Sequence, residues 1–256
     1  MQTRTVVPSL RFGLILVAQL WLAHAMGYLV HEYAHTVVAW VLGHKANPLA
    51  LDYGHLDAVN LLIQAEIDEN VDYAPIFAAG KGAHAALIAV AGVLFGNGLC
   101  YLLSRRLYGR FLAQGRRWLT LFFFLLCLMN VGNFIAYVPC RTFTTHADMA
   151  TVAKGLNISP WWIAMVMGLP FCVAVWHFLA KITPEAVRFI APESQRTQIG
   201  LALLAVFMIF RFYGSSGIRN YGEASHWISF AFMNVLAPLS LLLCWPRQQG
   251  IDAAPR

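Results

Sequence analysis

The chain has 256 residues, of which 59% are hydrophobic and only 12% are charged. A soluble globular chain carries about 25% charged residues, so this composition excludes an ordinary soluble domain and predicts an integral protein of the lipid bilayer. The formal net charge is +6, but the cations lie between apolar runs instead of forming a basic patch interleaved with aromatic residues, so we expect no nucleic-acid partner.

Six apolar runs follow one another along the chain, and a bilayer-spanning helix needs roughly 20 residues; the first run is longer than one span requires. They predict an all-α fold, a polytopic transmembrane helix bundle that forms a single integral membrane domain over residues 1–256. The fifth run is short and contains Arg211, so it is the least regular of the six. The runs are Phe12–Leu42, Ala83–Leu103, Trp118–Val138, Trp161–Leu179, Ile199–Tyr213 and Trp227–Trp245.

The first run contains Ala23-His24-Ala25, which is similar to the cleavage site of a signal peptide. The apolar character resumes after Ala25 and continues to about Leu42. Cleavage would remove the first half of this helix, so we expect an uncleaved first span.

Lysine and arginine are divided unequally between the two sets of loops, with twelve on one side and five on the other when Arg211 is left out. The positive-inside rule then predicts a cell-membrane protein with both termini in the cytoplasm. The larger set is Arg4, Arg11, Arg105, Arg106, Arg110, Arg116, Arg117, Lys181, Arg188, Arg196, Arg247 and Arg256. The smaller set is Lys45, Lys81, Arg141, Lys154 and Arg219.

The first long loop, residues 44–82, is acidic. Its segment Ala58–Ile67 fits either an amphipathic helix or a short strand. The loop is either simply solvated or guides a substrate to a neighbouring site.

The stretch MGYLVHEYAHTVVAW, residues 26–40, places His31, Glu32 and His35 inside the first apolar run. An ionisable side chain at membrane depth costs at least about 2.5–3.5 kcal/mol, and a bound dication offsets that cost. Residues four apart share a helix face, so both imidazoles can bind one ion. Glu32, about 100° round the helix from His31, can then act as a general base. H-E-x-x-H therefore predicts a Zn²⁺ site; the alternative is a group of polar side chains that snorkel at a helix end.

A catalytic zinc ion takes three protein ligands and leaves one position open. Two candidates for the third ligand, His146 and Asp148, lie in the turn after the third span, within NVGNFIAYVPCRTFTTHADMA. With six spans, this turn lies on the same side of the membrane as the loop that follows HEYAH. We expect Asp148 to be the third ligand; His146 is an alternative, and Asp148 could instead cap the helix that begins near Met149.

These features resemble the site-2 protease family of intramembrane zinc metalloproteases (peptidase family M50). The likeness rests on HEYAH in an early apolar helix, on an Asn…Pro…Asp segment after a later one, and on AGVLFGN, residues 91–97, which is similar to the family's small-residue motif. It covers residues 20–155 and implies a metalloprotease core over about 12–155, with the spans near 199–213 and 227–245 outside it.

The resemblance also implies roles for particular residues and a class of substrate. The reaction would be hydrolysis of peptide bonds in or near transmembrane segments of membrane protein substrates. The implied zinc ligands are His31, His35 and Asp148, the implied catalytic base is Glu32, and Asn133 is implied to lie near the substrate.

The chain departs from the family pattern in the third-ligand segment. Pro139 follows Asn133 by six residues instead of three, eight residues separate Pro139 from Asp148, and Met149 replaces the usual glycine. These departures keep an inactive protease relative open as an alternative.

A non-catalytic membrane protein is the second alternative. His24 lies seven residues before His31 and so about 20° away on the same helix face. A face built from His24, His31 and His35 could bind haem or a metal. The sequence indicates no particular oligomeric state.

Overall fold

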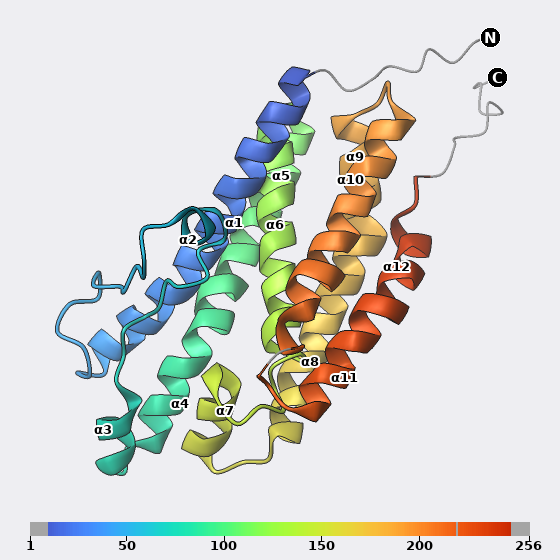
Figure 1. Cartoon of the computed structure of the whole chain (residues 1–256). Helices are drawn as coiled ribbons and strands as arrows, with labels where there is room; N and C mark the ends of the chain where they lie inside the picture. The colour runs from blue at the N-terminus through green and yellow to red at the C-terminus, as the bar shows by residue number, and fades with distance from the viewer. Residues whose placement is uncertain (1–9, 219, 247–256) are drawn as a thin grey trace, which may run out of the picture.

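The computed structural model describes residues 10–218 and 220–246 (Figure 1). Within these residues the regular structure is helical, and the only β feature is an isolated bridge between Asp52 and Asp68. Six helices are long and apolar enough to cross a membrane, which confirms the predicted all-α polytopic bundle. The spans are Leu10–Val41, Gly82–Ala113, Arg117–Tyr137, Pro160–Ile190, Gln195–Gly217 and Glu223–Cys244.

Two spans, α1 (Leu10–Val41) and α6 (Arg117–Tyr137), are uninterrupted α-helices, and α1 runs unbroken through Ala23-His24-Ala25. The other four each contain a π-helical turn. Their elements are α4 (Gly82–Ala91), η1 (Gly92–Gly98) and α5 (Leu99–Ala113); α8 (Pro160–His177), η2 (Phe178–Ile182) and α9 (Thr183–Ile190); α10 (Gln195–Phe207), η3 (Met208–Tyr213) and the 3₁₀ turn η4 (Gly214–Gly217); and α11 (Glu223–Ala231), η5 (Phe232–Leu236) and α12 (Ala237–Cys244).

The fifth span is longer than its apolar run indicates. It begins at Gln195 because the Ser194 hydroxyl accepts a hydrogen bond from the Thr197 backbone N–H, which draws polar residues into the first turn. The second and fourth spans likewise continue past the expected ends, to Ala113 and Ile190. Helix ends with polar side chains extend beyond the hydrocarbon, where hydropathy gives no signal.

The helix α6 forms the centre of the bundle, where it packs against α1, α5 and η3. Its large side chains Phe124, Leu125 and Leu128 are fully buried. A helix that is apolar all round is typical of one surrounded by protein. On the outer helices, by contrast, side chains such as Leu169 and Leu242 are exposed, as expected where a helix faces lipid.

The loop after α1 holds two short helices, α2 (Ala58–Ile63) and α3 (Tyr73–Ala78), capped by Asp57 and Asp72. The helix α2 decides between the helix and strand interpretations of its segment. The Trp21 indole N–H donates to the Leu61 carbonyl over 3.0 Å, so the loop folds back along α1 (Figure 1). Trp21 lies about 30 Å along the axis from the end of α1 at 1.5 Å per residue, so α2 lies alongside α1 far from the end at which the loop leaves it.

The bundle has two ends with different elements (Figure 1). The start of α1, the α5–α6 turn and the α9–α10 turn lie at one end; α7 (Ala147–Leu156) and the last turn of α1 lie at the other. The larger of the two groups of lysines and arginines, as far as the structure describes it, belongs to the helices that meet at the end with the start of α1. Four residues of the cation count fall outside the described residues: Arg4, Arg219, Arg247 and Arg256.

Candidate metal centre

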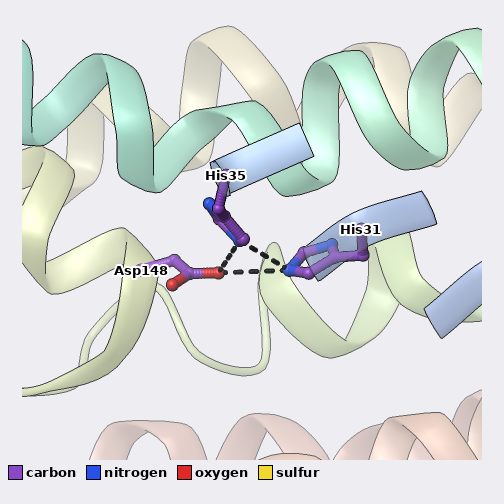
Figure 2. Close-up of side chains that lie close together, drawn as sticks. All are labelled: His31, His35 and Asp148. Atoms are coloured by element: carbon purple, nitrogen blue, oxygen red, sulfur yellow. Dashed lines mark hydrogen bonds and ion pairs between the residues drawn. The ribbon is translucent and has the colours of Figure 1, made fainter. Parts of the chain in front are cut away.

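The two histidines of HEYAH lie in the second half of α1, where that helix packs against α4, η1 and α6. Both imidazoles are buried, with 2% of His31 and 1% of His35 exposed. Asp148 reaches them from the first turn of α7 (Figure 2). Two helices far apart in the chain, α1 and α7, thus bring two nitrogens and a carboxylate together, as predicted for these residues.

The three side chains converge on one point (Figure 2). The two Nε2 atoms are 3.1 Å apart. The Asp148 Oδ2 atom lies 3.3 Å from Nε2 of His31 and 3.4 Å from Nε2 of His35. A tetrahedral ion with bonds of about 2.0 Å holds its ligand atoms about 3.3 Å apart, so the spacing fits such an ion.

The tautomers of both histidines follow from their second ring nitrogen. The Nδ1–H of His35 donates to the Ile88 carbonyl over 2.6 Å, and the Nδ1–H of His31 donates to the Asn97 amide oxygen over 2.7 Å. In the neutral rings each Nε2 therefore carries a lone pair. Two lone pairs and a carboxylate oxygen that face each other repel unless a cation or proton lies between them. This donor set can hold a metal ion.

The π-helical turn η1 packs directly against the imidazoles, and its glycines make this possible. A Cβ atom on Gly92 would lie 2.3 Å from Nε2 of His35 and 2.5 Å from Nε2 of His31. One on Gly96 would lie 2.7 Å from the Val30 carbonyl oxygen. The small residues of AGVLFGN therefore let a second helix touch the metal-binding face of α1.

The same turn supplies Asn97, which is fully buried. Its amide nitrogen donates to the Gly27 carbonyl and to the Asn130 side chain, so its oxygen is directed at His31. Such a second hydrogen bond fixes the orientation and the tautomer of a metal-binding imidazole.

The helix α7 carries Asp148 and is docked on α4 through two glycines. A Cβ on Gly155 would lie 2.4 Å from the Gly82 carbonyl oxygen, and a Cβ on Gly82 would lie 2.6 Å from the Gly155 oxygen. Ala147, directly before Asp148, has φ +68°, a left-handed conformation that costs a non-glycine residue of order 1 kcal/mol or more. The packing of α7 offsets this strain.

The Asp148 carboxyl is in its ionised form at neutral pH. Burial favours the neutral acid, but the interactions with His35 and His31 outweigh burial, so the pKa of Asp148 lies below its ordinary value. An ionised carboxylate is the form that binds a cation.

Glu32 lies beside the donor set without joining it. Its side chain is buried, with 5% exposed, and it makes no hydrogen bond to any residue in 10–218 or 220–246. It is close enough to His35, Asp148 and Glu69 for their charges to interact. A buried carboxylate without a protein donor can bond a water molecule.

Glu69 belongs to the loop that folds back along α1. Its Oε1 accepts a hydrogen bond from the Tyr73 hydroxyl over 3.0 Å, and burial raises the pKa of this carboxyl above its ordinary value. Because Glu69 interacts electrostatically with Glu32 and His35, the loop lies near the site instead of being only a solvated connection.

Three other candidates from the sequence lie outside the donor set. The Nδ2 of Asn133 donates to the Met129 carbonyl of its own helix. His146 stacks on Tyr221 with ring centroids 4.7 Å apart. His24 bonds through both ring nitrogens, to the Ile63 carbonyl and to the Tyr213 hydroxyl, each over 3.0 Å.

Two residues beside the donor set, Tyr137 and Asn97, are not indicated by the H-E-x-x-H pattern. Tyr137 stacks on His31 with ring centroids 4.4 Å apart, but a tyrosine at the end of an apolar run is typical of a membrane interface. Asn97 could have been found, because it is a lone amide inside the apolar small-residue motif, where an unpaired polar group is costly.

Comparison with known proteins gives no relative of this chain. No family model matches it, and no curated protein and no solved structure matches it either.

Proposed function

We propose that this chain is a zinc metalloendopeptidase similar to the site-2 protease family, which hydrolyses peptide bonds in or near transmembrane segments of membrane protein substrates. The observation that carries the proposal is the convergence of two imidazole nitrogens and one carboxylate oxygen within 3.1–3.4 Å, inside a membrane bundle.

The donor chemistry supports zinc as the metal. Imidazole nitrogen and carboxylate oxygen are both common zinc ligands, and three protein ligands with one open position are typical of catalytic sites, whereas structural sites are closed by four. The hydrogen bonds from the imidazoles to Asn97 and Ile88 leave both Nε2 atoms free to bind the ion.

The residues around the donor set support peptide hydrolysis. Zinc bound there would supply a Lewis acid that polarises the scissile carbonyl. Glu32 then takes the proton of the attacking water and passes it to the leaving amine. A substrate helix hides its carbonyls in backbone hydrogen bonds, so it must unwind locally before a carbonyl can reach these groups.

The charge distribution supports a cell-membrane location with both termini in the cytoplasm, since the described cations of the larger set belong to one end of the bundle. The metal centre then lies in the opposite half of the membrane. Single cysteines at Arg110 and Asn47, in a cysteine-free background, should be labelled by an impermeant thiol reagent from opposite sides. Labelling of both from one side would refute this orientation.

The test of the function combines metal analysis with cleavage. Purified wild-type protein should contain close to one zinc per chain, and the His31→Ala/His35→Ala double variant should contain none. Glu32→Gln should keep the metal and lose cleavage of co-reconstituted membrane proteins, whereas the exposed-loop control Glu66→Gln should retain both.

Three results would count against the proposal. Wild-type protein that purifies without metal contradicts the zinc site. Zinc-loaded protein that cleaves nothing identifies an inactive protease relative. A Soret band would favour a haem carrier, although the second nitrogen of His24 is already engaged by Tyr213.

A further inference from the structure

The segment between Pro139 and Asp148, longer than the family motif, holds Arg141, a half-buried arginine whose Nε atom is fully buried. The Arg141 guanidinium carbon lies 5.1 Å from the ring centroid of Tyr137 and 4.9 Å from that of Tyr221. Both contacts are cation–π contacts, which position a cation without neutralising it. Arg141 is therefore held in a defined place by two aromatic rings from different parts of the chain.

The charge of Arg141 makes no ion pair in the described part of the chain, although Asp148 is near enough for the two charges to interact. No carboxylate of residues 10–218 and 220–246 lies within ion-pair distance of it, and its Nε is buried there without a hydrogen-bond partner. Guanidinium stays protonated at any physiological pH, and a buried charge is costly unless it is paired and hydrogen-bonded. The fold thus leaves the buried Nε–H of this cation without an acceptor in the described residues, so that an incoming carboxylate can bond it.

The position of Arg141 relates it to the metal centre. Tyr137, which holds the guanidinium on one side, stacks on His31 at 4.4 Å. The Tyr137 ring centroid lies 4.4 Å from the His31 ring centroid and 5.1 Å from the guanidinium carbon of Arg141, so this carbon lies at most 9.5 Å from the His31 ring centroid. An extended peptide advances about 3.3 Å per residue, so this distance corresponds to about three residues of substrate.

A cavity of about 580 Å³ adjoins the same group of rings. Its lining is polar at His146, Ser215, Ser216, Asn220 and Tyr221 and apolar at Ile218 and Met233. Arg141 does not line the cavity itself, but it contacts Tyr221, which does. No aspartate or glutamate contributes to this lining within the described residues. The cavity therefore offers hydrogen-bonding groups and no negative charge to repel an acidic ligand.

We propose that Arg141 and this cavity form a substrate subsite for an acidic side chain, aspartate or glutamate, within three residues of the scissile bond. The inference rests on the proposed protease function. The proposed subsite gives the long Pro139–Asp148 segment a role. The segment presents the Arg141 guanidinium, which forms a salt bridge when an acidic substrate side chain is bound.

Two measurements with one peptide library test this subsite. Wild-type full-length protein in nanodiscs cleaves a proteome-derived library, and mass spectrometry gives the residues around each cut. The Glu32→Gln protein, in the same nanodiscs, selects peptides from the library by binding alone. We expect aspartate and glutamate to be enriched within three positions of the cut, and enriched among the bound peptides.

Variants at Arg141 separate its charge from its packing. Arg141→Met should lower the acidic enrichment roughly 10- to 100-fold, the effect of one hydrogen bond to a charged group. Arg141→Glu should shift the enrichment to lysine and arginine, which loss of packing alone cannot do. Lys154→Met is the matched control: Lys154 also contacts an aromatic ring, Phe77 at 4.2 Å, but lies outside the subsite, so its profile should equal that of wild type.

The outcomes separate this inference from the proposed function. Cleavage without acidic enrichment overturns the subsite and leaves the protease standing. Binding enrichment that depends on Arg141, without any cleavage, supports the subsite and counts against the protease. An unchanged profile in a folded, zinc-loaded Arg141→Met protein overturns the subsite, and circular dichroism and metal content establish that state for each variant.

Discussion

The substitution Gly92→Ala tests whether η1 and the two imidazoles form one close-packed unit. Its Cβ would lie 2.3 Å from Nε2 of His35, while ordinary contacts begin at 3.4 Å, so the nitrogen must retreat by about 1.1 Å. A zinc site tolerates deviations of only about 0.2 Å in its bond lengths. The methyl group also meets Nε2 of His31, so neither ring can move toward the other for relief.

We expect Gly92→Ala to lower zinc affinity by more than about 100-fold, beyond the 10- to 100-fold typical of altering a hydrogen bond to a ligand. Competitive titration of purified protein against a fluorescent zinc chelator measures this affinity, and circular dichroism checks the fold. Gly98→Ala is the matched control in the same turn, because its Cβ would meet nothing closer than 3.6 Å. A Gly92→Ala protein that binds zinc as tightly as the Gly98→Ala protein would falsify the proposed packing.

Three further outcomes follow from the site and its surroundings. Asn97→Ala should lower zinc affinity about 10- to 100-fold, because His31 loses the acceptor that fixes its tautomer, and the same titration measures the loss. Ala147→Gly should keep the metal and raise the unfolding midpoint, by an amount equivalent to about 1 kcal/mol of relieved strain; a lower midpoint contradicts the left-handed conformation. Glu69→Gln should make metal-free protein more stable at pH 8 than wild type and flatten the fall of its stability with rising pH. The stability of the wild type falls with rising pH because the raised pKa of Glu69 makes the folded state hold a proton that the unfolded chain has released above about pH 4.3. Equal melting curves of the two metal-free proteins from this pH up to pH 8 would contradict the prediction.

The architecture could be predicted from the sequence because a helix that crosses the hydrocarbon core must be long enough and apolar. Each apolar run became a span, and the errors lie at the ends, where Ser194 extends the fifth helix into polar residues. The approach of Asp148 to His31 and His35 was also predictable from membrane sidedness. The choice of Asp148 over His146 as the nearer group depends on where α7 docks, which no local pattern contains.

Side-chain pairings between distant elements were beyond the sequence. Tyr137 and Tyr221 look like interfacial aromatics, and Arg141 was counted as an ordinary loop cation, yet the guanidinium of Arg141 contacts both rings. Periodicity describes which face of a helix is apolar, but it does not describe which residue of another helix meets that face. His24 shows the same limit, since its partners come from a loop and from η3.

The glycine contact between α4 and α7 ties the position of Asp148 to the span that also contacts His31 and His35. Because Gly82 and Gly155 hold α7 against α4, and Gly92 of the same span contacts both imidazoles, this one span packs against both helices that carry the donor set. The position of Asp148 therefore depends on the contact between Gly82 and Gly155 as well as on the turn that precedes it. A side chain at either glycine would displace α7, and Asp148 with it, from the two imidazoles although it would touch neither ring.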